Sequence, residues 1–317
     1  MAKENKKINI LVMVGPTASG KTKVSIELAK QFNGEIISAD SMQIYKDMDI
    51  GTAKPTKEEM QGVSHHLLDF LSVDEDFSVA EYVKLAKEKI KDINNRGKLP
   101  IICGGTGLYI NSLIDNVTFT EQESDPAIKE ELIKRFEKYG VEPLIAELST
   151  FDEESAKKIH PNNTLRIIRA IEIYRTTGTT MSEQLRNSKL KKSPYNPIII
   201  GLNFKNRDIL YDRIDKRVDL MINTGLIEET KKIILKNPSK TAMNAICYKE
   251  ILPYLQSKCT KEVAIENLKR ATRRYAKRQL TWLRKDKRIK WVYIDKYENF
   301  GEILEKCTKY IDFQKNI

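Results

Sequence analysis

A glycine-rich segment near the start of the chain fits the phosphate-loop pattern G-x-x-x-x-G-K-[ST]. It reads Gly15-Pro16-Thr17-Ala18-Ser19-Gly20-Lys21-Thr22. The apolar run before it (8–14) predicts a buried strand, and the residues after it (23–32) carry apolar side chains at helical spacing. Between a strand and a helix, such a loop points successive backbone N–H groups at phosphate oxygens. We therefore expect the segment to bind a diphosphate or triphosphate, with the Lys21 ammonium on its oxygens and the Thr22 hydroxyl on a Mg²⁺ ion.

The strands that follow differ from those of an ordinary nucleotide hydrolase. Phosphate-loop hydrolases usually carry a magnesium-binding Asp at the end of a second apolar strand. Here the run 35–39 leads into Asp40, whereas the run 99–103 leads into a glycine turn that contains Thr106 and no acid. This pattern argues against nucleotide hydrolysis. Asp40 could serve as a general base, a magnesium ligand or a turn and helix cap, and the residues alone leave these alternatives open.

The order of the segments predicts the fold class. Strand-like and helical segments alternate as far as residue 111, which is typical of an α/β protein with a P-loop NTPase-like doubly wound parallel sheet. The region 117–195 has helical spacing and no strand-like run. We predict a core built from residues 1–116 and 196–317, with residues 117–195 as a helical insertion domain. Asp40 would then lie at the carboxyl edge of the sheet, where ligands of such folds bind.

Positive charge gathers near the end of the chain. The formal net charge is +11, and positions 269 to 290 hold eleven basic residues and one acid. On a helix, three large residues seven positions apart would face the core: Leu268, Tyr275 and Trp282. Three arginines would form a row on another face: Arg270, Arg274 and Arg278. A solvated basic face and a contact with nucleic acid both fit this pattern.

Cysteine usage and hydropathy predict the setting of the protein. The four cysteines are scattered, without a C-x-x-C pair: Cys103, Cys247, Cys259 and Cys307. This argues against structural zinc and a disulfide framework, and it suits a reducing cytoplasm. No apolar run approaches the length of a membrane span. We expect a cytoplasmic protein without membrane contact. Because nothing marks an interface, we expect a monomer.

Several further strings resemble the tRNA dimethylallyltransferases, also called tRNA isopentenyltransferases. They follow one another in the family's order over roughly residues 8–293. The strings are Asp40-Ser41-Met42-Gln43-Ile44-Tyr45, Met48-Asp49-Ile50-Gly51-Thr52-Ala53-Lys54-Pro55, His65-His66-Leu67-Leu68-Asp69, Gly104-Gly105-Thr106-Gly107-Leu108-Tyr109, His160-Pro161-Asn162 followed by Arg166, Arg169, Ala170 and Glu172, then Arg213 and Arg217, Tyr248-Lys249-Glu250, and Lys277-Arg278-Gln279-Leu280-Thr281-Trp282.

The resemblance implies an alkyl transfer to RNA. A dimethylallyl group would pass from dimethylallyl diphosphate to the exocyclic N6 amine of the adenosine immediately 3′ of the anticodon in tRNA, with release of pyrophosphate. The phosphate loop and Mg²⁺ would then hold the leaving diphosphate, with the Arg217 guanidinium on the same oxygens. Asp40 would take the proton of the amine. Thr106 would either hydrogen bond near the reacting centre or close the turn.

The same resemblance implies which residues contact tRNA. Enzymes that modify a base usually extrude it into a pocket. The implied contacts are Asp40, Ser41, Met42, Gln43, Thr106, Arg166, Arg169, Arg274, Lys277 and Arg278. The insertion would grip the anticodon stem-loop. Its alternative is a helical subdomain that does not contact RNA.

One position departs from the family pattern. Cys247 precedes Tyr248-Lys249-Glu250, where the family usually has glycine. Because cysteine resists a positive φ that glycine adopts freely, the local backbone and any RNA contact there are in question.

Other functions fit parts of the sequence. A small-molecule kinase would use the loop for ATP and Asp40 to activate a hydroxyl, but it has no use for the basic helix. A prenyltransferase acting on free adenine nucleotides would not need it either. A nucleotide-dependent RNA-binding switch without catalysis would keep its RNA affinity after loss of Asp40.

Overall fold

The computed structural model describes residues 7–117, 125–188 and 192–311. The chain divides into two compact units, Met1–Ile114 together with Pro194–Ile317, and Asp115–Ser193. Tyr195, expected in the insertion, is the first residue of a strand of the first unit. Asp115 and Asn116, expected in the core, belong to the second unit.

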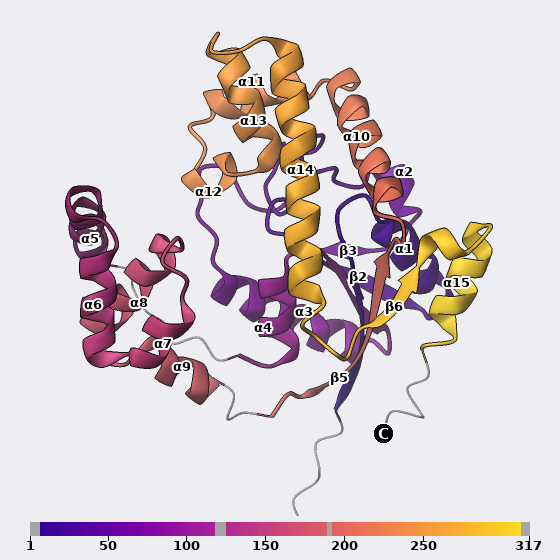
Figure 1. Ribbon diagram of the computed structural model, residues 1–317. Helices are drawn as coiled ribbons and strands as arrows, with labels where there is room; N and C mark the ends of the chain where they lie inside the picture. Colours follow the sequence, from indigo (N-terminus) through magenta and orange to yellow (C-terminus); the bar gives the residue numbers. More distant parts are fainter. Residues whose placement is uncertain (1–6, 118–124, 189–191, 312–317) are drawn as a thin grey trace, which may run out of the picture. The chain divides into compact units, whose positions relative to one another are not determined.

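The first unit is built on a six-stranded sheet with the order β3-β2-β4-β1-β5-β6 (Figure 1). Every neighbouring pair is parallel. The strands are β1 (Ile8–Val14), β2 (Gly34–Ala39), β3 (His65–His66), β4 (Leu99–Gly104), β5 (Tyr195–Asn203) and β6 (Lys290–Tyr293). The prediction of an α/β fold with a doubly wound parallel sheet is therefore confirmed.

The helices of the first unit cover the two faces and the carboxyl edge of this sheet. They are α1 (Lys21–Gln31), α2 (Lys57–Met60), α3 (Val79–Asn95), α4 (Gly107–Ile114), α10 (Arg207–Asn223), α11 (Leu226–Leu235), α12 (Lys240–Met243), α13 (Ile246–Leu255), α14 (Lys261–Leu283) and α15 (Phe300–Thr308), with a 3₁₀ turn at Ile294–Lys296. The chain moves from β1 out to β2 and then back to β4, so right-handed crossovers place α1 and α3 on opposite faces.

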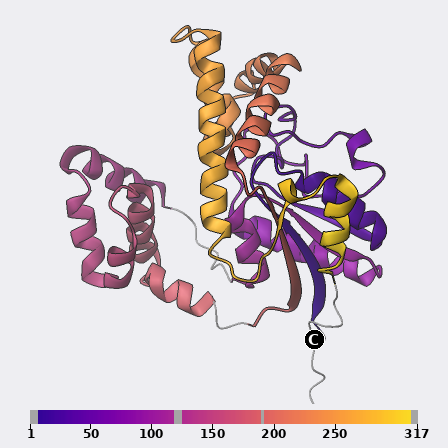
Figure 2. The same ribbon diagram turned by 45° about the vertical axis from the view of Figure 1, so that its right-hand side comes forward.

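The apolar core follows from the period-two pattern of the strands. Leu11 and Met13 of β1 join one buried cluster with Leu28 of α1 and Ile303 of α15. A second cluster lies beyond the carboxyl ends of the strands, where α11, α13 and α14 surround the fully buried Tyr45. The long helix α14 lies beside α10 and α13 in both views (Figures 1 and 2). These helices cover the carboxyl ends of the strands, where the site is formed.

The second unit consists of helices in the described residues: α5 (Pro126–Tyr139), α6 (Glu142–Phe151), α7 (Glu153–Lys158), α8 (Thr164–Thr177) and α9 (Met181–Ser188). It has its own core, in which Leu132 and Leu148 pack against Ile168 and Ile171 of α8. The rings of Phe151 and Tyr174 stack at 3.9 Å. Within the described residues, no helix is long and apolar enough to cross a membrane.

A buried carboxylate joins β2 and β3 to the short connection between α3 and β4. Glu35 of β2 has a side chain only 4% exposed and accepts from Arg96 Nη1 at 2.5 Å and Lys98 Nζ at 2.7 Å. His66 Nε2 of β3 lies 2.7 Å from its other oxygen. The hydrogen bonds from Arg96 lower the pKa of the Glu35 carboxyl far below its ordinary value, against the opposing effect of burial.

We predict that Glu35→Gln lowers the free energy of unfolding at pH 7 by about 2 kcal/mol, because charge-assisted hydrogen bonds are lost. The folded-state pKa of Glu35 is depressed, so its stabilisation is present above the ordinary value of 4.5 and is lost as the pH falls below it. Urea unfolding between pH 7 and pH 3 should show the gap to wild type narrowing in acid. The exposed Glu88→Gln is the control, and a gap that stays constant with pH would contradict the prediction.

Candidate functional site

The phosphate loop turns sharply between β1 and α1. Gly15 has a φ of 155°, and a Cβ there would lie 2.5 Å from the backbone oxygen of Leu202 on β5. Gly20 has a φ of 82° and immediately precedes the first residue of α1. Lys21 Nζ donates to the Pro16 carbonyl at 2.9 Å. The loop thus lies at the N-terminus of α1, where the helix dipole and free N–H groups favour an anion.

Gln279 of α14 joins this loop to the turn after β4. Its Oε1 accepts from the Thr17 N–H at 2.9 Å, and its Nε2 donates to the Gly105 carbonyl at 3.1 Å. The side chain is buried, at 7% exposure. A Cβ on Gly105 would lie 2.2 Å from Gln279 Nε2, and one on Gly107 would lie 2.1 Å from the Trp282 ring. Glycine at position 105 thus leaves room for the Gln279 amide, and glycine at position 107 leaves room for the Trp282 ring.

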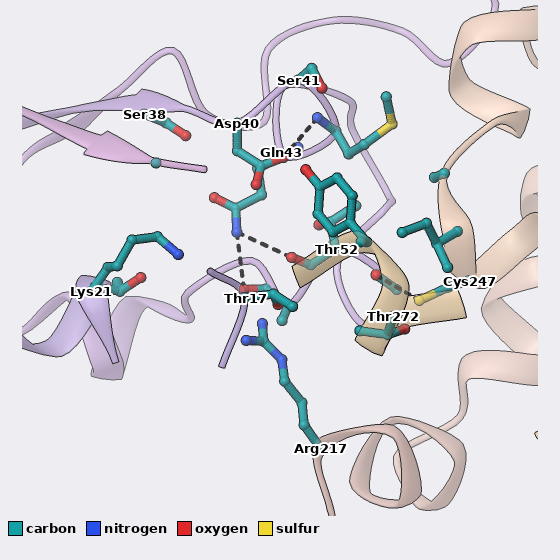
Figure 3. Close-up of a pocket in the computed structure, with 18 of the residues that line it drawn as sticks. Thr17, Lys21, Ser38, Asp40, Ser41, Gln43, Thr52, Arg217, Cys247 and Thr272 are labelled. Atoms are coloured by element: carbon teal, nitrogen blue, oxygen red, sulfur yellow. Dashed lines mark hydrogen bonds between the residues drawn. The ribbon is translucent and has the colours of Figure 1, made fainter. Parts of the chain in front are cut away.

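A cavity of about 310 Å³ opens beside the loop (Figure 3). One part of its wall is polar or charged, with Thr17, Lys21, Thr22, Ser38, Asp40, Ser41, Gln43, Arg217 and Arg278. Another part is apolar, with Met42, Ile214, Val218, Met221 and Ile246. The structure thus brings together residues from the phosphate loop, the end of β2 and helices α10 and α14. A ligand with an anionic head and a short apolar tail matches this division.

Two cations that make no ion pair with a described residue face this cavity, which Asp40 also lines. Burial is the largest cause of the pKa shifts of Lys21 and Arg217, and it lowers both pKa values below their ordinary values. Among the described residues, no carboxylate lies within ion-pair distance of either group. Figure 3 shows both side chains directed toward the region beside Thr17. Because a buried cation is costly without a partner, this end of the cavity favours a multiply charged anion.

Asp40 lies at the end of β2 and lines the cavity. Its Oδ1 accepts from the backbone N–H of Met42 at 2.9 Å and of Gln43 at 3.3 Å. The turn-capping role considered for this residue is therefore present. Within the described part of the chain, its other oxygen makes no hydrogen bond with the protein. Capping and proton transfer use different oxygens of one carboxylate, so the two roles are compatible.

Thr106 holds the turn that carries Asp40. Its Oγ1 accepts from the Ser41 N–H at 3.0 Å, and its own N–H donates to the Ala39 carbonyl at 3.1 Å. Thr106 does not line the cavity, whereas Ser41, Met42 and Gln43 do. The Thr106 hydroxyl thus contacts the backbone beside Asp40.

Cys247 raises no difficulty for the backbone. It is the second residue of α13 and is not among the described residues with positive φ, so the position does not require glycine. Its thiol donates to the Gly51 carbonyl at 3.0 Å. Burial raises the pKa of Cys247 to about 12, which keeps the thiol neutral. The concern about the local backbone was therefore wrong, because a helical φ accommodates any residue with a Cβ.

The basic row of α14 is exposed at Arg270, Arg274 and Arg278. Arg278 also lines the cavity, and its guanidinium lies 5.7 Å from the Tyr275 ring. Of the three residues expected in the core, Leu268 is buried, but Tyr275 lines the cavity and Trp282 covers Gly107. This face of the helix therefore packs against the turn after β4 and the cavity as well as the core.

The two arginines of α8 have different surroundings. Arg166 is exposed. Arg169 Nη1 lies 3.0 Å from Glu172 Oε2, and the Glu172 side chain is only 3% exposed. Arg169 therefore forms an ion pair with a buried acid of its own helix, and Arg166 is the more accessible cation.

Gln279 and Arg217 show what the sequence could reveal. Arg217 was expected from the family strings, and the structure brings it to the cavity. Gln279 belongs to the string Lys277-Arg278-Gln279, but no role was expected for it. Its signal is only a polar residue at a position of α14 whose neighbours in the helix turn, Ala276 and Leu283, are buried.

The described residues contain no group of three or more His, Cys, Asp or Glu that could hold a metal ion. Thr22 lines the cavity next to Lys21. A divalent ion would therefore take most of its oxygen ligands from a bound phosphate and water, which is the manner in which Mg²⁺ usually binds.

Comparisons with known proteins point to one family. The family model described as IPP transferase matches residues 43–286. The chain is 52% identical to a tRNA dimethylallyltransferase of Thermoanaerobacter sp. (strain X514), covering 96% of this chain and 98% of the relative. It is 51% identical to that of Bacillus subtilis (strain 168), covering 90% and 91%.

Solved structures are similar over almost the whole chain. A tRNA isopentenylpyrophosphate transferase from Bacillus halodurans is 45% identical, with a TM-score of 0.72 and 96% of each chain covered. A eukaryotic dimethylallyltransferase acting on tRNA is 29% identical, with a TM-score of 0.81, covering 98% of this chain and 80% of that one.

We predict that Gln279→Leu weakens the binding of inorganic pyrophosphate about tenfold, because the Thr17 N–H and the Gly105 carbonyl lose their partner and the loop loosens. Isothermal titration calorimetry with Mg²⁺ present measures this, with the exposed Gln256→Leu as the matched control. Unchanged affinity in a folded Gln279→Leu protein would show that the bridge does not organise the loop.

Proposed function

The chain belongs to the IPP transferase family of tRNA dimethylallyltransferases, and we propose that it transfers a dimethylallyl group from dimethylallyl diphosphate to the N6 amine of the adenosine immediately 3′ of the anticodon in tRNA. Pyrophosphate is released. The observation that carries this proposal is that one cavity brings together Asp40, an apolar wall and two cations without an ion-pair partner among the described residues, Lys21 and Arg217.

The cationic end receives the diphosphate. The carbon–oxygen bond to the allylic carbon breaks, and its electron pair stays on the departing oxygen. Lys21, the loop N–H groups and the Arg217 guanidinium stabilise the negative charge that develops there. The dimethylallyl chain lies on the apolar wall near Val218 and Met221. This arrangement also explains why no phosphoryl group needs to move.

We propose Mg²⁺ as the metal, with the Thr22 hydroxyl as its protein ligand. When bound, the ion neutralises part of the charge on the diphosphate oxygens. The hydroxyl at the start of α1 and the absence of a multi-carboxylate cluster in the described ranges support this choice.

Asp40 acts on the acceptor. The adenine leaves the anticodon-loop stack and enters the cavity, where Ser41, Met42 and Gln43 line its pocket. As the new carbon–nitrogen bond forms, the oxygen of Asp40 that makes no hydrogen bond with the protein takes a proton from the amine. Thr106 assists by holding the backbone of Ser41.

The basic residues position the RNA. We propose that Arg274, Lys277 and Arg278 of α14 and Arg166 and Arg169 of the insertion contact the phosphate backbone of the anticodon stem-loop. The protein acts as a monomer in the cytoplasm, where unmodified tRNA is available. Phosphate contacts of this kind make binding sensitive to salt.

The direct test is incubation of the protein with unmodified tRNA, Mg²⁺ and labelled dimethylallyl diphosphate, followed by nuclease digestion and mass analysis of the nucleosides. Label on an adenosine next to the anticodon, together with released pyrophosphate, is the expected result. Transfer to free adenine nucleotides alone, or turnover of ATP alone, would replace the proposal with one of the alternative activities.

In the same assay, Asp40→Asn should lower the rate of transfer by about 10² to 10⁴, because the general base is lost while the hydrogen bonds of Oδ1 can persist. Binding of tRNA, measured by filter retention, should stay at the wild-type level. A variant that keeps most of its activity would rule out Asp40 as the base.

Arg166→Ala should weaken tRNA binding and reduce the slope of log affinity against log salt by about 0.7 to 0.9, the value for one lost phosphate contact. The melting temperature should not change, because Arg166 is exposed. Lys84→Ala, exposed on α3, is the control. An unchanged salt slope would leave the insertion as a subdomain that does not contact RNA at this residue.

A further inference from the structure

One wall of the cavity is a loop that a single carboxylate holds in place. Glu229, in the first turn of α11, accepts hydrogen bonds from three consecutive backbone N–H groups, those of Asp49 at 3.0 Å, Ile50 at 2.8 Å and Gly51 at 2.8 Å. The hydroxyl of Tyr248 donates a fourth bond at 2.8 Å. These four donors come from two segments nearly two hundred positions apart.

Three contacts fix the position of Gly51. Its N–H donates to Glu229, its carbonyl accepts from the Cys247 thiol, and a Cβ on it would lie 2.9 Å from Tyr248 Cζ. Burial, followed by the proximity of Glu229, raises the pKa of the Tyr248 hydroxyl, so it remains a neutral donor. Helices α11 and α13 therefore fix the position of this loop, and Gly51 itself lines the cavity.

The same loop determines how Gln43 is oriented. Gln43 Nε2 donates to the carbonyls of Thr52 at 3.1 Å and Ala53 at 3.2 Å. Because carbonyls can only accept, the amide nitrogen must face the loop, and the Oε1 acceptor is turned away from it (Figure 3). The Gln43 N–H in turn donates to Asp40 Oδ1. Hydrogen bonds, together with the backbone of the loop and the side chain of Gln43, thus link Glu229 to the Asp40 turn.

We infer that Glu229 is a positioning residue for the transfer reaction: it holds the loop 49–53 so that Gln43 presents an acceptor oxygen beside Asp40 to the incoming amine. The inference rests on the proposed function. An exocyclic amine has two hydrogens, of which Asp40 removes one and Gln43 Oε1 accepts a hydrogen bond from the other. Glu229 itself touches neither substrate, and no bond is made or broken at it.

A carboxylate is required here because all four partners are donors. Glu229→Gln keeps the size of the side chain but replaces one acceptor oxygen with an NH₂ group, which faces N–H or O–H donors. The neighbouring Glu228 is exposed on the same helix turn. Glu228→Gln therefore changes the net charge equally without touching the loop, and it is the matched control.

The test combines steady-state kinetics of transfer to tRNA with hydrogen-exchange mass spectrometry of the full chain. For Glu229→Gln we expect kcat to fall about 10- to 100-fold, since small misplacements of reacting groups carry costs of this size. The KM for dimethylallyl diphosphate should not change, and exchange should accelerate in the peptide that covers residues 49–53. Glu228→Gln should match wild type in all three measurements.

Two results would overturn the inference. One is faster exchange in the loop with unchanged kcat, which would show that the loop does not control transfer. The other is a loss of kcat accompanied by weaker binding of dimethylallyl diphosphate and faster exchange throughout the first unit, which would reduce Glu229 to a general stabilising residue.

If Glu229→Gln does not fold, Tyr248→Phe is the second variant. It removes one of the four hydrogen-bond donors and should lower kcat several-fold without changing the KM for dimethylallyl diphosphate. An unchanged kcat in this variant also contradicts the inference. Failure of the wild-type protein to modify tRNA at all would instead reject the proposed function.

Discussion

The site depends on the hydrogen bonds by which Gln279 joins α14 to the sheet edge. One buried amide satisfies the Thr17 N–H of the phosphate loop and the Gly105 carbonyl of the turn after β4. Because Tyr275 and Arg278 of α14 line the cavity, the same helix that holds the phosphate loop also forms part of the cavity wall. The glycines at positions 105 and 107 leave room for the side chains of Gln279 and Trp282, which a Cβ at these positions would meet.

Around this framework, charge is distributed unevenly. Lys21 and Arg217 face one end of the cavity without a carboxylate partner among the described residues, whereas the carboxylates of Glu35 and Glu229 are surrounded by donors. The first arrangement leaves an attraction for a multiply charged ligand. The second rigidifies the backbone, because each donor that a buried acid binds is held in one place. Binding and positioning are thus separated between two kinds of charged group.

The parts of the molecule that follow from local pattern agree with the sequence analysis. The apolar run 8–14 became β1 with the expected bounds, and the run 35–39 became β2 with one added residue. Apolar runs and glycine loops are short-range signals, so they can be recognised without knowledge of the fold. Tyr195 was misplaced because the strand β5 begins with a polar stretch, Tyr195 and Asn196, that does not resemble a buried strand.

The sequence by itself determined the phosphate loop, the carboxylate at the end of β2, the basic helix and the family to which the chain belongs. All of these are strings or periodicities that local geometry enforces. Only the tertiary structure decided that Cys247 lies in a helix, that Thr106 supports the Asp40 turn without lining the cavity itself, that Arg169 pairs with Glu172, and that Gln279 and Glu229 hold loops far away in the chain. The physical reason is that the identity of a polar residue does not reveal its hydrogen-bond partner. Whether the side chain faces water, a ligand or a distant backbone N–H depends on which segments the fold brings within hydrogen-bond reach.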